Sequence, residues 1–269
     1  MDTLNNLKSL STPNLQELQN HFIDYIYKND NGIIKDLVTP EENLDIYKNS
    51  IFITQTEALN TIFNTASEYL TQNPHNLDLK YNLQNIIKVF VKNIPCGNSD
   101  YLEYAEKFII FLKEITLTPN IEYLNCLMKL DINYSQLLMQ KNNILPDYSI
   151  LQNIDNCNPK QIYITTPDIY KIIELDYDII DLWDYFITYK EFKPHKIIKT
   201  KQLLFMTCFN HNIYTILINH QILTFLNLIN KSKNSSIESI SSKYIKNSDF
   251  ENIFISCVQK NLIYIENNA

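Results

Sequence analysis

The residues best suited to bind a metal ion are Cys208, His211 and His220, which lie close together in the 269-residue sequence. Structural zinc sites use four ligands at short, characteristic spacings, and catalytic zinc sites use three. The spacing here matches neither pattern, because a cysteine in an apolar run is followed by a histidine in a turn signal. The sequence therefore favours a buried thiol and two ordinary imidazoles over a metal centre, and it predicts no cofactor.

Paired carboxylates for general acid–base catalysis could come from an acidic run in the second half of the chain. This run comprises Glu174, Asp176, Asp178, Asp181 and Asp184. It lacks the glycine and the twelfth-position acid of a calcium-binding loop, so we expect a solvated acidic face. The sequence also contains no G-x-S-x-G nucleophile motif. We therefore predict no catalytic residue and expect that the protein is not an enzyme.

Composition narrows the function classes further. The chain has only 2 glycines, too few for dinucleotide fingerprints or phosphate-binding loops. Its formal net charge is -7, and all 23 of its basic residues are lysines. Proteins bind duplex DNA through a cationic surface and through arginine contacts to guanine. We therefore expect any DNA binding to be weak and indifferent to sequence.

The 5 cysteines are widely spaced and form no C-x-x-C pair, which is typical of reduced thiols. The N-terminal residues resemble neither a secretory signal nor a transit peptide, so we expect a cytoplasmic protein. One stretch, residues 202–230, contains no Lys, Asp or Glu. Two clusters of Asn, His and Gln interrupt it, which favours a buried hairpin and helix over a membrane span.

Helix start signals and apolar spacing predict an all-helical first half. Thr12-Pro13, Thr39-Pro40 and Ser99-Asp100 are typical of helix N-termini, and apolar residues then recur every three or four positions. We expect successive helices up to Leu145-Pro146.

The pattern changes after Pro146. Residues 161–165 alternate as in a strand, and residues 203–209 and 213–218 are β-branched or aromatic runs around an Asn-His-Asn turn. The remaining signals predict helices at 220–231, from 237 and at 249–260, and a strand at 262–265. We therefore predict an α+β fold, with a helical bundle over residues 1–145 and a winged-helix-like α+β module with a small antiparallel sheet over residues 146–269.

Three short motifs in residues 14–70 stand in the order found in a known family. The first is LQELQNHF, and the second is LDIYKNS, which contains Leu44, Tyr47, Lys48 and Asn49. The third contains Ala58, Leu59 and Phe63. This order resembles the bacterial HvfC-type family, with its L-x-x-L-Q-x-x-F, L-x-I-Y-R-N-N and A-L-x-x-x-F-P motifs. Trp183 stands in the place of that family's late I-W pair.

The sequence departs from the family pattern at three positions. Lys48 replaces the usual arginine, Ser50 replaces an asparagine and Asn64 replaces a proline. Lysine keeps the charge of arginine but cannot make a planar bidentate contact. None of the motif residues is of a catalytic type. We expect Tyr47 and Trp183 to lie in the core, and Asn49 to cap or bridge backbone groups.

The resemblance implies two alternative functions. The label inherited by the family is DNA binding, which would make Lys48 a phosphate contact. Relatives such as the methanobactin-biosynthesis subunit MbnC instead act with a DUF692-type iron enzyme. They are non-catalytic accessory subunits that help present a Cys-containing precursor peptide for conversion into a copper-binding product.

The acidic net charge and the absence of arginine favour the second function. The resemblance therefore implies two partners, a DUF692-type enzyme and a precursor peptide. A strand edge in the second half of the chain could bind the peptide by β-augmentation, and the uncharged run at 202–230 is the expected source of that edge.

Overall fold

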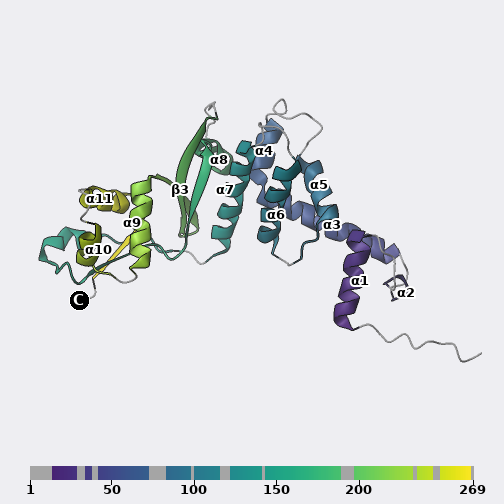
Figure 1. The fold of residues 1–269 in the computed structure, drawn as a ribbon, viewed down its shortest axis with the longest axis horizontal. Coiled ribbons are helices and arrows are strands. Elements are labelled where there is room, and N and C mark those ends of the chain that lie inside the picture. The colour runs from purple at the N-terminus through teal and green to yellow at the C-terminus, as the bar shows by residue number, and fades with distance from the viewer. Residues whose placement is uncertain are drawn as a thin grey trace, which may run out of the picture. The chain divides into compact units, whose positions relative to one another are not determined.

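The computed structural model describes residues 14–28, 34–37, 42–72, 83–97, 100–115, 122–140, 143–188, 197–232, 235–244 and 249–267. The fold is mixed α+β with small antiparallel sheets (Figure 1). Contacts between Cα atoms divide the chain into two compact units, Met1–Leu117 and Thr118–Ala269, which we call unit 1 and unit 2.

Unit 1 is helical throughout the residues that the structure describes. Its helices are α1 (Leu15–Lys28), α2 (Ile34–Leu37), α3 (Glu42–Ile62), α4 (Asn64–Gln72), α5 (Leu83–Asn93) and α6 (Tyr101–Ile115). The start predicted for α6 is confirmed, because the Asp100 carboxylate accepts the backbone N–H of Leu102 at 2.9 Å. The start of α1 is capped by Asn14, which exchanges hydrogen bonds with Glu17. The predicted caps Thr12-Pro13 and Thr39-Pro40 lie outside the described residues.

Aromatic rings form much of the unit 1 core. Phe90 on α5 lies 4.8 Å from the ring of Tyr104 and 5.1 Å from that of Phe108, both on α6. Phe108 also contacts Phe63, at the junction of α3 and α4. All four residues are buried, so these ring contacts join α3, α5 and α6.

Unit 2 combines helices with five strands in its described residues. Its helices are α7 (Glu122–Met139), the 3-10 helix η4 (Ser149–Asn156), α8 (Ile180–Thr188), α9 (His220–Lys231), α10 (Ile237–Tyr244) and α11 (Phe250–Gln259). Its strands are β1 (Ile162–Thr165), β2 (Tyr170–Tyr177), β3 (Lys199–Phe209), β4 (Asn212–Ile218) and β5 (Tyr264–Asn267). The predicted strand at 161–165 and the predicted helices at 220–231, from 237 and at 249–260 are confirmed.

The strands form two antiparallel sheets, one of β1 and β5 and one in the order β2-β3-β4. The predicted hairpin is confirmed as β3 and β4, joined by Asn210 (φ 48) and His211 (φ 65). Asparagine and histidine tolerate this left-handed conformation better than most residues, and a two-residue hairpin turn requires it twice. The uncharged run at 202–230 is therefore this hairpin followed by α9. Within the described residues, no helix is both long enough and apolar enough to cross a bilayer.

Strand β2 is not among the predicted elements. Glu174 and Asp176 are exposed, as expected for a solvated acidic face, but they alternate along β2 with the buried residues Ile173 and Leu175. This alternation is the pattern of a strand with one face in the core. The strand forms by antiparallel pairing with β3, a contact distant in sequence.

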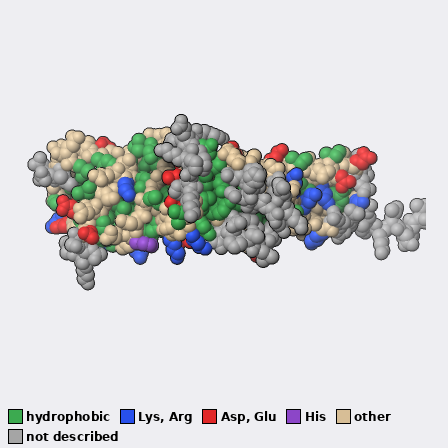
Figure 2. Space-filling view, turned by 90° about the horizontal axis from the view of Figure 1, so that it is seen from above, with side chains coloured by type: hydrophobic (Ala, Val, Ile, Leu, Met, Phe, Trp, Pro, Cys, Tyr) green, Lys and Arg blue, Asp and Glu red, His purple; other side chains and the backbone are tan. Residues whose placement is uncertain are grey.

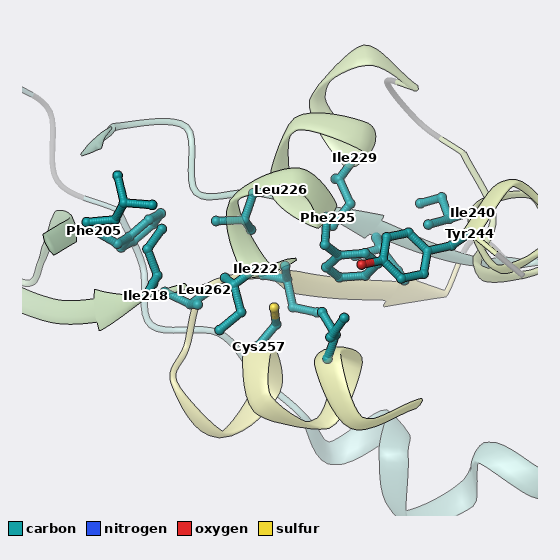
Figure 3. Close-up of a cluster of buried hydrophobic side chains, with 14 residues drawn as sticks. Phe205, Ile218, Ile222, Phe225, Leu226, Ile229, Ile240, Tyr244, Cys257 and Leu262 are labelled. Carbon is teal, nitrogen blue, oxygen red and sulfur yellow. The ribbon is translucent and has the colours of Figure 1, made fainter. Parts of the chain in front are cut away.

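The core of unit 2 lies between the three-stranded sheet and the later helices. Phe205 and Ile218 from the sheet pack in one cluster with Phe225 and Leu226 of α9 and Cys257 of α11 (Figure 3). Tyr170 of β2 stacks on the Phe205 ring at 5.0 Å. These contacts join the three-stranded sheet to α9 and α11. Helix α7 contacts the same sheet through β2, β3 and β4.

Helix α7 groups with the strands rather than with the earlier helices. The sequence places a domain boundary after residue 145, whereas the contacts divide the chain between Leu117 and Thr118. The reason is that the segment after α7 continues into the sheet. Asn143 donates its backbone N–H to the Cys208 carbonyl at 3.0 Å and accepts the N–H of Asn210 at 3.4 Å.

Candidate functional site

The outer edge of β4 is the candidate binding site. Among the described residues, the strand neighbour of β4 is β3 alone, and Phe209 pairs with Asn212 directly beside the two-residue turn. Hydrogen-bonded and non-hydrogen-bonded pairs alternate along such a hairpin. Tyr214 and Ile216 therefore direct their backbone N–H and C=O groups toward β3. The same groups of Ile213, Thr215 and Leu217 point away from the sheet, and we call these three residues the β4 edge.

One hydrogen bond to the β4 edge is present among the described residues. The Lys260 Nζ donates to the Leu217 carbonyl at 3.1 Å. In the described part of the chain, the backbone groups of Ile213 and Thr215 have no such partner. Unpaired strand edges of this kind can pair with another chain.

The other edge of the sheet is β2, and its side chains make it a poorer site. Strand β2 carries Lys171, Glu174 and Asp176, whereas β4 carries no charged residue. Charged side chains on an edge strand discourage pairing with a further strand. Tyr214 and Leu217 of β4 are instead 36% and 47% exposed, so they offer apolar surface beside the open backbone groups. The β4 edge is the better candidate for this reason.

Local interactions hold β4 in place at both ends. At its start, the Tyr214 ring contacts the ring of Phe209 on β3 at 5.3 Å. At its end, the Asn219 side chain caps α9 by accepting the N–H of Ile222 at 2.8 Å. This cap stops the strand and starts the helix at one residue. The β4 edge is therefore part of a regular strand that is anchored at both ends.

The side chain of Asn143 supports the sheet from inside, and the sequence analysis did not identify it. It donates to the Ile169 carbonyl at 2.7 Å and to the Thr207 Oγ1 at 3.0 Å, and it accepts the Ile169 N–H at 3.2 Å. Asn143 and Thr207 are buried. This network joins the segment after α7 to β2 and β3. The role is structural, because these hydrogen bonds go to backbone groups of Ile169 and to the hydroxyl of Thr207.

The family-motif residues of unit 1 are mainly core residues. Leu44, Leu59 and Phe63 are buried, and Ala58 is half-buried. Leu44 packs in a cluster that contains Tyr25 of α1. These positions hold α3 against its neighbours.

The prediction that Tyr47 lies in the core is wrong. Its side chain is 54% exposed, and its ring meets Phe22 of α1 edge-on at 5.9 Å. Tyr47 lies on a helix as predicted, but the contact with Phe22 leaves more than half of its side chain exposed. Asn49 is exposed as well. Lys48 donates to the Tyr25 carbonyl at 3.3 Å, and its Nζ lies 5.3 Å from the centre of the Tyr25 ring, so it links α3 to α1.

Trp183 is 2% exposed, as expected for a core anchor. Its indole Nε1 donates to the Asp131 Oδ1 of α7 at 2.9 Å, and its ring meets that of Tyr134 edge-on at 5.6 Å. Asp131 is itself buried, so the tryptophan supplies a hydrogen bond to a carboxylate inside unit 2. The contact joins α8 to α7.

The described residues contain no group of three or more His, Cys, Asp and Glu side chains that could hold a metal ion. Cys208 is buried, whereas His211 and His220 are exposed. In the acidic run, Glu174, Asp176 and Asp181 are exposed to solvent.

On the face shown in Figure 2, described lysine side chains lie in several separate groups.

We expect the cysteines to react with iodoacetamide in two classes at about pH 8. Cys96 and Cys157 are partly exposed, whereas Cys126, Cys208 and Cys257 are buried. Burial raises the pKa of Cys126 and Cys208, and it raises the pKa of Cys257 to about 12. At about pH 8, a thiol with a raised pKa has a smaller fraction in the reactive thiolate form. Mass spectrometry should find Cys96 and Cys157 alkylated first and the buried three only after denaturation. Rapid alkylation of Cys257 in the folded protein would contradict this.

The sequence matches no protein-family model, and no curated protein is significantly similar to it.

Proposed function

We propose that this chain is a non-catalytic partner subunit that binds an extended polypeptide segment along the β4 edge. The observation that carries the proposal is the uncharged β4 strand, whose outward N–H and C=O groups lie beside the exposed side chains of Tyr214 and Leu217. In β-augmentation, such backbone groups supply affinity and the alternating side chains supply selectivity.

The size of the edge sets the strength of the interaction. Ile213, Thr215 and Leu217 offer alternating backbone donors and acceptors to a segment about as long as β4. Each backbone hydrogen bond contributes on the order of 0.5–1.5 kcal/mol net. Contacts with the apolar side chains of Tyr214 and Leu217 add to this. Several such hydrogen bonds and apolar contacts together are typical of a specific but reversible complex.

The resemblance to the HvfC-type family supports a more specific version of the proposal. The partner enzyme would be a DUF692-type iron enzyme, and the bound segment would belong to a Cys-containing precursor peptide. The helices of the first half would form the bundle of this family. The β3–β4 hairpin with α9, α10 and α11 would form its winged-helix-like, peptide-recognising module.

Co-expression tests this version directly. We expect the chain to co-elute in size-exclusion chromatography with a DUF692-type enzyme encoded beside its gene and with the neighbouring Cys-containing peptide. The chain purified alone should hold no stoichiometric iron. Failure to co-elute, with and without the peptide, would overturn the enzyme partnership. Conversion of the peptide by the isolated chain would overturn the accessory role.

A further inference from the structure

We propose that Lys260 selects a polypeptide that carries an acidic side chain next to the residue paired with Leu217. This inference rests on the proposed binding of a strand to the β4 edge. It adds the chemical character of that strand, which the backbone pairing alone does not determine.

The position of Lys260 is the first argument. Lys260 is the C-cap residue of α11, and its backbone N–H donates to the Ser256 carbonyl at 3.1 Å. Its Nζ reaches the Leu217 carbonyl at 3.1 Å in an exposed position. The partial negative charge at a helix C-terminus favours a cation there. The ammonium group is therefore held at one end of the β4 edge.

The charge balance around Lys260 is the second argument. Its ammonium makes no ion pair with a carboxylate among the described residues. Strand β4 contributes no charged side chain either. An ammonium group has three donors, so Lys260 keeps hydrogen-bonding capacity beyond its bond to Leu217. It is a positive charge beside an otherwise uncharged binding edge.

Binding of a strand changes the partner of Lys260. In a β-ladder, an N–H of the incoming strand would take the Leu217 carbonyl. The ammonium is then displaced toward the incoming backbone and requires a new acceptor. A carboxylate on the incoming strand within one residue of that N–H provides a charge-assisted hydrogen bond. A basic side chain at the same place would instead meet a like charge.

A second copy of this chain is a poorer occupant. A second copy of β4 carries no carboxylate, so it would displace Lys260 from Leu217 and return no acceptor. The expected occupant is therefore a different polypeptide, with Asp or Glu at the end of the paired segment that lies beside Leu217.

Selection from a random-peptide library displayed on phage tests the inference with the full chain. We expect the wild-type protein to enrich peptides with Asp or Glu at one fixed position. The Lys260→Glu variant should enrich Lys or Arg at that position. Lys160→Glu, which makes the same charge change at an exposed residue before β1, should select as the wild type does.

Affinity measurements on one enriched peptide complete the test. Replacing its acid by the amide should weaken binding to the wild type about two- to five-fold, the range of an exposed ion pair. The same replacement should have no effect with Lys260→Gln, whose folding is checked by its thermal unfolding midpoint. Enriched peptides without an acid preference would overturn the role of Lys260 while leaving edge binding intact. Failure to enrich any peptide would overturn both proposals.

Discussion

The Thr215→Pro variant should lose about five-fold or more in affinity for a peptide selected on the wild-type protein, while its stability changes little. Proline removes the outward N–H of the central residue in the β4 edge, and its ring obstructs an incoming strand. The missing Thr215 bond and one neighbouring bond that the ring obstructs, at about 0.5–1.5 kcal/mol each, together lower the affinity by about 5- to 150-fold. The N–H of Thr215 has no partner in the described residues, and proline is tolerated on edge strands.

Two matched variants make the test specific. Thr215→Val keeps the N–H and the branched side chain, so it should bind as the wild type does. Ile216→Pro removes an N–H that donates to β3 across the Phe205–Ile216 pair. It should therefore destabilise unit 2 by about 1–3 kcal/mol, the cost of leaving a buried ladder group unpaired. Isothermal titration calorimetry and thermal unfolding separate the two effects. Equal destabilisation by Thr215→Pro and Ile216→Pro would mean that the assigned edge direction is wrong.

Trp183→Ala should destabilise unit 2 by about 3–5 kcal/mol, the range for removal of a buried aromatic side chain. The loss has two parts, the packing of the ring against Tyr134 and the hydrogen bond to Asp131. Trp183→Phe keeps most of the ring volume and removes the indole N–H. It should cost about 1–3 kcal/mol, the range for removing a hydrogen-bond partner of a buried polar group.

Chemical denaturation followed by circular dichroism measures both variants, because Trp183 is the sole tryptophan and its fluorescence disappears with it. In the wild type, the same tryptophan reports the unfolding of unit 2 by fluorescence. A cost below about 1 kcal/mol for Trp183→Ala would contradict its assignment as a core residue.

Elements defined by local signals could be predicted from the sequence. The apolar spacing of α3, the Asp100 cap of α6 and the Asn-His turn between β3 and β4 act over a few residues. The mixed α+β class follows from the same signals. The uncharged character of β4 was also visible in the sequence, and it drew attention to the region that contains the candidate edge.

Features defined by distant contacts required the tertiary structure. Strand β2 was hidden by Glu174 and Asp176, because charged residues on the solvent side of a strand resemble a polar loop until the partner strand β3 is known. Helical spacing predicts an apolar stripe on α3 that includes Tyr47. How much of that stripe α1 covers is decided by the packing of the two helices. Asn143 carried no sequence signal, since its role depends on Ile169 and Thr207.

The sequence by itself determined the composition of this protein, including its lack of arginine, its helix-rich first half and its hairpin. Only the tertiary structure decided that α7 belongs with the strands, that β4 lies at the edge of its sheet and that Lys260 reaches Leu217. The physical reason is the range of the interactions. Propensities, caps and turns are local, whereas strand order and the neighbours of a side chain arise from contacts between residues far apart in the chain.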